Sequence, residues 1–459
     1  MHALQNERLT MIRITDYARR GILLAAFAAL AAPAPTTAAD PGRPRDARDD
    51  VVAFIGVNVV PMDAERVLEN QTVVVRDGRI AALGPAGDVA VPDDAIRIDA
   101  RGKYLVPGIA EMHGHLPGGN TPPEVAEAIL FLFVANGVTT VRGMQGNPAQ
   151  FTLRARIERG ELIGPTLYLG SPALHGNRAR TPEEGARLVR EYHAAGFDLL
   201  KVHEGLSPAT YDAIAATARE LGLAWGGHVA DDVGLEHALA AGQSTIDHLD
   251  GYLEALGDDP TRIPALARAT REAGAWVVPT MTLWDHGFLG VRTAEELRAF
   301  PELKYVPRPW VENWTEQLRN LRQGQDPATY ARGRELRRRL LKALADAEVG
   351  ILLGSDAPQM FNVPGFSLHR EMQVMAEAGL TPYQILRSGT RNVAAYFDAL
   401  DEFGTIAVGR RADLILLEAN PLDDVAHLRR RAGVMVRGRW LSEGEIQERL
   451  AGIAQRFGG

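Results

Sequence analysis

The sequence predicts an α/β protein, built as a (β/α)8 TIM barrel beside a small β-sandwich domain formed from both ends of the chain. Two observations support this prediction. Short β-rich runs alternate with helical stretches through the middle of the chain, and short strands separated by turn residues cluster at both of its ends. We therefore expect a composite β-domain over residues 51–105 and 404–445 and a barrel over residues 106–403.

Eight β-rich runs mark the expected barrel strands. A βαβ alternation predicts parallel strands, and eight such units over about 290 residues match the size of a TIM barrel. The runs are Val106–His115, Val138–Gly143, Thr166–Gly170, Leu199–His203, Ala224–His228, Thr245–Leu249, Trp276–Thr280 and Ile351–Asp356.

The helices between these strands carry start signals. Thr181-Pro182, Ser207-Pro208 and Thr381-Pro382 each place a capping residue before a proline, the order typical of a helix N-terminus. The stretch Leu283–Ala347 is longer than one barrel helix requires. It is expected either to fold over the barrel mouth as a lid or to form a surface excursion.

The composition limits the classes of protein. The chain has 459 residues, 46% of them hydrophobic and 24% charged, as in an ordinary globular protein. Its net charge of −8 argues against a nucleic-acid partner. Because the chain contains no cysteine, disulfides and thiolate metal sites are excluded, and any metal must be held by nitrogen and oxygen.

The N-terminus has the pattern of an export signal. Basic residues precede the apolar run Gly21–Ala32, and Ala38-Ala39 offers a cleavage site. We expect a signal peptide over residues 1–39, a linker over residues 40–50, and a periplasmic or secreted protein without a stable membrane span. Arg19-Arg20 also fits a twin-arginine signal, so both general and twin-arginine export stay open.

Histidines and an aspartate end several of the expected strands. His113 and His115 alternate on the first strand, so both side chains can point the same way. His228 ends the fifth strand, His248 lies near the end of the sixth, and Asp356 ends the eighth. Since the active site of a TIM barrel lies at the carboxyl ends of its strands, these side chains are expected to meet.

Lys201 lies near the end of the fourth expected strand, in the apolar context Leu199-Leu200-Lys201-Val202. A lone buried ammonium would cost several kcal/mol. The alternatives are a surface lysine that extends its amine into solvent and a lysine carbamate, formed with carbon dioxide, whose oxygens bridge two cations. The histidines at the neighbouring strand ends favour the carbamate.

These motifs together resemble the amidohydrolase superfamily. Val106-Pro107-Gly108-Ile109-Ala110-Glu111-Met112-His113-Gly114-His115 is similar to its first-strand motif, with Glu111 where aspartate is usual. Gly354-Ser355-Asp356-Ala357 is similar to its eighth-strand motif. The resemblance implies that His113, His115 and Asp356 hold one metal, that His228 and His248 hold a second, and that carboxylated Lys201 bridges them.

The resemblance also implies a reaction and a metal. A metal-bridging hydroxide would attack an amide or cyclic amide, with Asp356 as general acid and base. Zinc is the expected metal, although the ligands also suit manganese, iron, cobalt or nickel. The pattern is closest to imidazolonepropionase-like enzymes and Xaa-Pro or acyl-amino-acid peptidases. His175, His203 and Tyr252 are candidate substrate-binding residues, against the alternative of ordinary loop or surface positions.

Other functions stay open at this point. A lactonase or phosphoester hydrolase can use the same metals, and metal ligands alone do not separate these activities. A non-catalytic binding barrel is disfavoured because all six ligand positions hold competent residues. A solute-binding protein is disfavoured by the histidines at the strand ends. The expected partner is a small-molecule substrate, and the protein can form a homo-oligomer.

Overall fold

The computed structural model describes residues 50–257, 259–290, 292–323 and 327–458. The expected signal peptide lies outside the described residues, as does the expected linker apart from Asp50. Among the described residues, no helix combines the length and the apolar character that crossing a membrane requires.

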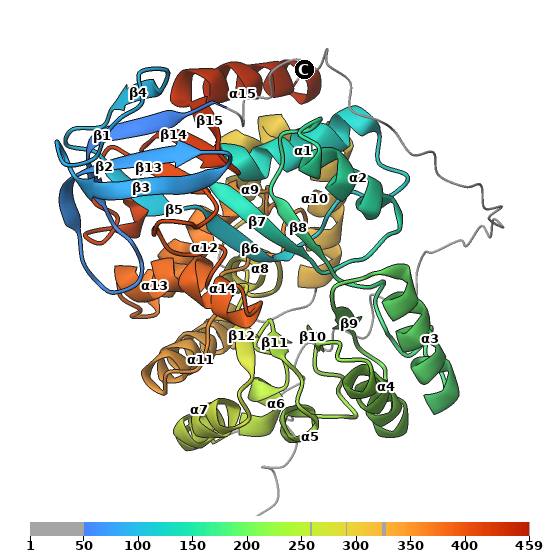
Figure 1. Cartoon of the computed structure of the whole chain (residues 1–459). Coiled ribbons are helices and arrows are strands. Elements are labelled where there is room, and N and C mark those ends of the chain that lie inside the picture. Colours follow the sequence, from blue (N-terminus) through green and yellow to red (C-terminus); the bar gives the residue numbers. More distant parts are fainter. Residues whose placement is uncertain (1–49, 258, 291, 324–326, 459) are drawn as a thin grey trace, which may run out of the picture. The chain divides into compact units, whose positions relative to one another are not determined.

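Strands from both ends of the chain share one sheet (Figure 1). Its order is β15-β14-β13-β5-β1-β2-β3, and β4 also pairs with β1. The antiparallel pairing of β5 with β13, which sets Val106 opposite Ile415, joins the N-terminal strands to the C-terminal ones. The described strands form a single hydrogen-bonded sheet, and the packing of a sandwich stays a prediction. The strands are β1 (Val52–Val59), β2 (Leu68–Arg76), β3 (Arg79–Pro85), β4 (Ile96–Asp99), β5 (Tyr104–Pro107), β13 (Leu414–Leu417), β14 (Arg431–Val436) and β15 (Arg439–Ser442).

The expected first barrel strand, Val106–His115, is in fact two strands. Tyr104–Pro107 (β5) belongs to the sheet just described, whereas Ile109–Gly114 (β6) begins a parallel sheet. The chain changes sheets at Gly108, where an added Cβ would lie 2.2 Å from Thr139 Oγ1. The run is apolar on both sides of this glycine, so hydrophobic pattern alone does not reveal the break.

Two parallel sheets follow in the middle of the chain. One has the order β6-β7-β8 and the other β12-β11-β10-β9. Isolated bridges extend them, with Gly170 pairing Leu199 between β8 and β9, and Val277 of β12 pairing Ile351. The strands are β7 (Val138–Gly143), β8 (Thr166–Leu169), β9 (Leu200–Val202), β10 (Trp225–Gly227), β11 (Thr245–Asp247) and β12 (Trp276–Val278).

The expected eighth strand, Ile351–Asp356, is not a regular strand. Its backbone hydrogen bonds are divided among several partners, since the Leu353 carbonyl accepts from Met112 N–H at 2.8 Å while Leu353 N–H donates to Ser388. Asp356 then adopts a left-handed φ of 61°. The segment therefore contacts both β12 and β6, but it lacks the repeated pairing that defines a strand.

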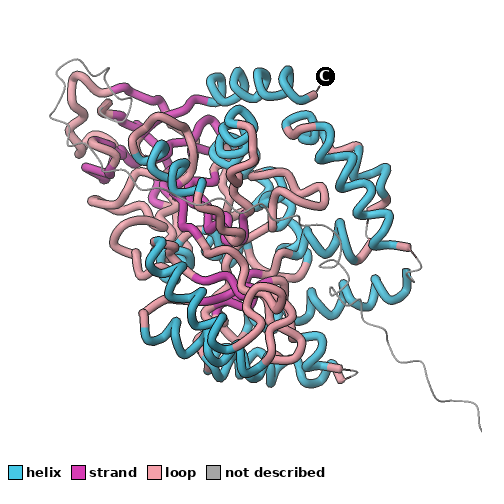
Figure 2. The backbone as a smooth tube through the Cα atoms, turned by 90° about the vertical axis from the view of Figure 1, so that its right-hand side faces the viewer, coloured by secondary structure: helices cyan, strands magenta, loops and turns pink. Residues whose placement is uncertain are grey.

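Helices flank the strands (Figure 2). The three predicted helix starts are confirmed, because the side chains of Thr181, Ser207 and Thr381 each accept a hydrogen bond from a backbone N–H of the first turn. The helices that flank the strands are α1 (Pro123–Ala135), α2 (Ala149–Glu158), α3 (Pro182–Ala195), α4 (Pro208–Glu220), α5 (Leu235–Ala241), α6 (Tyr252–Leu256), α7 (Ile263–Glu272), α12 (Phe366–Glu377), α13 (Pro382–Gly389), α14 (Arg391–Tyr396) and α15 (Glu443–Phe457).

The long segment 283–347 is mostly helical and is tied to the core. Leu297, Trp314 and Leu318 are buried, and the Trp314 ring lies 5.8 Å from that of Phe361. These contacts show a packed part of the protein rather than a loose surface excursion. Its elements are α8 (Met281–Leu283), the π-helical turn η3 (Trp284–Phe288), α9 (Ala294–Arg298), η4 (Pro301–Tyr305), α10 (Arg308–Arg322) and α11 (Pro327–Asp346).

Candidate metal centre

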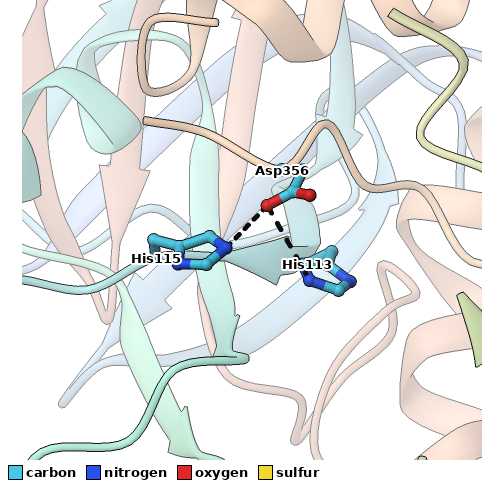
Figure 3. A group of neighbouring side chains, drawn as sticks. All are labelled: His113, His115 and Asp356. Carbon is cyan, nitrogen blue, oxygen red and sulfur yellow. Dashed lines mark ion pairs between the residues drawn. The ribbon is translucent and has the colours of Figure 1, made fainter. Parts of the chain in front are cut away.

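His113, His115 and Asp356 form a compact group (Figure 3). One ligand atom from each lies within 4.8 Å of the others. His115 Nε2 is 2.6 Å from Asp356 Oδ1, and His113 Nε2 is 3.8 Å from the same oxygen. His113 lies on β6 and His115 directly follows it, and Asp356, whose backbone has a left-handed φ of 61°, brings its carboxylate to meet them.

His228 and His248 continue this group. The rings of His113 and His248 lie 4.4 Å apart, and those of His248 and His228 lie 4.5 Å apart. His228 directly follows β10 and His248 directly follows β11, so both lie at carboxyl ends of parallel strands. His248 Nε2 is buried without a hydrogen-bond partner among the described residues. A cation is one group that can satisfy such a lone pair.

Lys201 is buried in the same group. It lies on β9 with 2% of its surface exposed, and its Nζ is 3.2 Å from His113 Nε2. Burial lowers the pKa of Lys201, which favours the neutral amine. The alternative of a surface lysine is therefore wrong. The structure brings together all six residues that we expected to bind metal.

The buried imidazoles are neutral. Burial, followed by the charge of Lys201, lowers the pKa of His228 to about 3. Burial likewise lowers the pKa of His113 and of His248 well below its ordinary value. A neutral imidazole has one nitrogen with a free lone pair, the form in which histidine binds a metal ion.

A hydrogen-bond partner orients each of the three buried rings at Nδ1. Asp247 Oδ2 lies 2.7 Å from His113 Nδ1 and also 3.0 Å from Arg142 Nη2. Asp250 lies 2.7 Å from His228 Nδ1, and Thr280 lies 2.7 Å from His248 Nδ1. Such partners fix the ring orientation and leave Nε2 for a metal. We did not predict them, although an aspartate inside the strand Thr245–Asp247 is a signal that identifies one.

Glu111 joins two backbone segments that carry residues of the metal centre. Its carboxylate is fully buried and accepts hydrogen bonds from the N–H of His113 at 3.0 Å and the N–H of Ser355 at 2.8 Å. Burial raises the pKa of Glu111 to about 8. The residue that departs from the usual first-strand motif thus connects β6 to the segment that carries Asp356.

Two of the three predicted substrate residues lie beside this centre. The His203 ring is 4.1 Å from that of His228, and the His175 ring is 6.5 Å from that of His203. Tyr252 is placed elsewhere. The chain turns at Gly251, with φ 77°, and Tyr252 enters the core with its hydroxyl 2.7 Å from Thr270. A hydroxyl already paired in the core is not available to substrate.

Neutral imidazoles, a carboxylate and a buried lysine at the ends of parallel strands define a candidate metal centre with nitrogen and oxygen ligands. The amidohydrolase family matches residues 104–441, more than half of the chain. The chain therefore belongs to the amidohydrolase family, and the prediction from its motifs is confirmed.

Individual relatives are more distant. An adenine deaminase from Ruegeria sp. (strain TM1040) is 24% identical over 381 residues, which are 78% of this chain and 52% of that protein. The chain thus spans about half the length of the curated relatives that it matches. Among solved structures, bottromycin amidohydrolase has a TM-score of 0.71 at 23% identity, covering 91% of this chain and 95% of that one. A putative prolidase from Bifidobacterium longum has a TM-score of 0.64 at 23% identity, covering 89% and 99%. These structures show the shared fold.

Proposed function

We propose that the chain is a metal-dependent hydrolase that cleaves the C–N bond of an amide or cyclic amide. The observation that carries this proposal is the convergence of His113, His115 and Asp356 within 4.8 Å. Membership of the amidohydrolase family supports it. So do the names of the similar proteins, an adenine deaminase and a prolidase, since both describe reactions at C–N bonds.

The proposal includes the architecture that presents the metal centre. The two parallel sheets and the segment Ile351–Asp356 form one closed (β/α)8 barrel that begins with β6 and extends to residue 403, beside a small β-domain from residues 51–107 and 404–445. The bridge between Gly170 and Leu199 supports one joint of this barrel, and the bridge between Val277 and Ile351 supports another. The hydrogen bond from Met112 N–H to Leu353 supports closure back to β6.

Two divalent ions, zinc in our proposal, fit the residues present. His113, His115 and Asp356 would hold one, His228 and His248 would hold the other, and Lys201, as a carbamate, would supply oxygen ligands to them. The buried and unpartnered His248 Nε2 supports this fit. His115 Nε2 and Asp356 Oδ1 lie 2.6 Å apart, close enough to contact one ion. To form the carbamate, the Lys201 amine adds to carbon dioxide and releases one proton.

Bound divalent ions acidify a water molecule and polarise a substrate carbonyl. The protein's own contribution to proton transfer is Asp356. Its carboxylate takes the proton from the attacking water and returns it to the leaving nitrogen, so that the amine departs neutral. His203 and His175 lie on the His228 side of the centre and contact the substrate. No covalent bond between protein and substrate is needed.

The setting of the enzyme is also part of the proposal. Residues 1–39 direct export, so the protein works in the periplasm or outside the cell on a small-molecule substrate. Nucleic acid is not a partner, and a homo-oligomer is compatible with this function.

Substrate profiling of the metal-loaded protein tests the proposal. We expect hydrolysis of N-acyl amino acids, dipeptides or cyclic amides rather than of lactones or phosphoesters. Asp356→Asn should lower turnover by a factor on the order of 10² or more while most metal is retained, because an amide cannot accept the proton. Asp212→Asn makes the same chemical change at an exposed carboxylate that pairs with His237, and should leave turnover as in the parent.

Two results contradict the proposal. One is hydrolysis confined to lactones or phosphoesters, which assigns the metal centre to C–O or P–O bonds. The other is near-normal turnover of metal-loaded Asp356→Asn, which removes the proton-transfer role of this residue.

A further inference from the structure

A second cavity lies outside the candidate metal centre. Its volume is about 490 Å³, within the range of small-molecule sites. None of the six expected metal ligands is among the described residues that line it. Its walls come from η4, the start of α12, the junction of η5 (Val425–Arg429) with β14, and α15.

The ring nitrogens of His369, in the wall of this cavity, make no well-aligned hydrogen bond to the described residues. The residue is 5% exposed, and neither ring nitrogen makes a hydrogen bond to any described residue, although the Asn136 carbonyl is near enough to act on the ring. Arg370 also lines the cavity, and its Nη1 is buried without a partner. Buried polar groups are usually satisfied, so these atoms point to a ligand.

The charged residues in the wall indicate the sign of the ligand's charge. Arg370, Arg429, Arg431 and Lys304 line the cavity together with a single acid, Glu302, which is paired with Arg370. Arg431 is paired with Glu443 at 3.0 Å, whereas Arg429 donates a hydrogen bond to the neutral side chain of Gln373. The cationic excess favours an anion, and arginine matches carboxylate and phosphate oxygens.

Part of the wall is aromatic. The rings of Tyr305 and Phe366 stack with their centroids 5.3 Å apart, and Lys304 Nζ lies 5.0 Å from the centre of the Tyr305 ring. Leu450 adds apolar surface. A ligand with an apolar or aromatic body can pack here while its charged group reaches the arginines.

We infer that this cavity, here named the cationic cavity, binds a small organic anion. Its carboxylate or phosphate group accepts hydrogen bonds from His369, Arg370 and Arg429, and its body packs against Tyr305 and Phe366. Burial, and then the nearby arginines, hold the pKa of His369 at about 3, so the ring is neutral and offers one N–H donor to the anion.

Calorimetric titration of the full chain with benzoate, inorganic phosphate and acetate tests the inference. We expect benzoate to bind more tightly than acetate, because only benzoate carries an aromatic body. Tighter binding of benzoate than of phosphate assigns a carboxylate ligand, and the reverse order assigns a phosphate ligand.

Substitutions locate the binding. Arg429→Gln and His369→Asn should each weaken binding of the preferred anion roughly tenfold, the effect of losing one charge-assisted or buried hydrogen bond. Arg308→Gln removes the same charge as Arg429→Gln from an exposed position on α10, and should bind the anion as the parent does. Arg429 is exposed, so its substitution is not expected to disturb folding.

Three outcomes overturn the inference. They are no binding of benzoate or phosphate to the parent, equal binding by the parent and the folded Arg429→Gln and His369→Asn variants, and equal affinity for acetate and benzoate. A crystal soaked with 4-bromobenzoate gives an independent measurement. A bromine anomalous peak in the cationic cavity supports the inference, and a peak only at the metal centre contradicts it.

Discussion

The candidate metal centre and the cationic cavity both contain buried histidines, but the hydrogen bonding of these histidines differs between the two sites. In the metal centre, Nδ1 of His113, His228 and His248 each has a partner 2.7 Å away. In the cationic cavity, neither nitrogen of His369 makes a hydrogen bond to a described residue. An oriented ring offers one lone pair in one direction, whereas the His369 ring makes no well-aligned hydrogen bond that would fix its orientation.

The difference follows from the elements that build each site. The metal centre rests on the ends of parallel strands, whose pairing holds backbone positions closely, and a second layer of partners holds the rings. The cationic cavity is assembled from helices and short turns far apart in the sequence. We therefore expect substitutions in the metal centre to have the larger effects, and those in the cavity to act on ligand affinity and pH-dependent stability.

The largest effect should come from Lys201→Ala. If a carbamate bridges two ions, this substitution removes the bridge, so both metal content and turnover should fall to a small fraction of the parent's. Added bicarbonate or short carboxylic acids should restore part of both by supplying oxygen ligands. Metal analysis measures the metal content, and a kinetic assay measures the turnover. The control is Lys342→Ala, since the Lys342 side chain forms a surface ion pair with Asp346. Tight binding of two metals per chain by Lys201→Ala rules out the bridging role.

A smaller effect should follow from Asp247→Asn. The substitution keeps the shape of the side chain but removes the carboxylate that orients His113, so metal affinity should fall by about 10-fold to 100-fold. Because Arg142 also loses its charged partner, the folded fraction is measured alongside metal titration. Thr280→Val removes the partner of His248 without changing charge, and should lower metal affinity in the same direction. Unchanged affinity in both folded variants would show that the rings are held by packing alone.

The smallest effect concerns the stability of the folded chain in acid, to which His369 of the cationic cavity contributes. The pKa of His369 is about 3 in the folded chain, below its ordinary value of 6.5. Between these values the unfolded chain takes up a proton that the folded chain excludes. The free energy of unfolding should therefore fall as pH drops below about 6.5, by roughly 1.4 kcal/mol per pH unit for this one group.

His369→Asn should make the pH dependence shallower by that amount. Denaturant unfolding at pH 7, 6 and 5, in buffers free of carboxylate and phosphate, measures the slope independently of any loss of absolute stability. His286, whose burial also lowers its pKa to about 3, stays in the variant, so part of the slope should remain. An identical slope in parent and variant would contradict the burial of a neutral His369.

Features that depend on local pattern were predictable. A capping residue before proline predicted the helix starts at Thr181, Ser207 and Thr381, because the cap and its N–H donor are only a few residues apart.

Other predictions were wrong because more than one structure satisfies the same local sequence pattern. The apolar run from Val106 to His115 fits one long strand or two short ones. The structure has two, and the chain changes sheets at Gly108, which Thr139 approaches closely. Tyr252 lies four residues after His248, yet the turn at Gly251 sends it into the core. Sequence distance does not give spatial distance once a chain reverses direction.

The sequence by itself determined the family, the alternation of strands and helices, and the residue types that gather at the strand ends, because each follows from short-range periodicity and recognisable motifs. Only the tertiary structure decided which groups orient those residues. Asp247, Asp250 and Thr280 act through contacts made by folded strand ends, and Glu111 acts across 244 positions on Ser355. The cationic cavity also depends on tertiary structure, because its charges come from three separate parts of the chain. Burial, which gives Lys201 and His369 their chemistry, is a property of the packed chain and has no short-range pattern in the sequence.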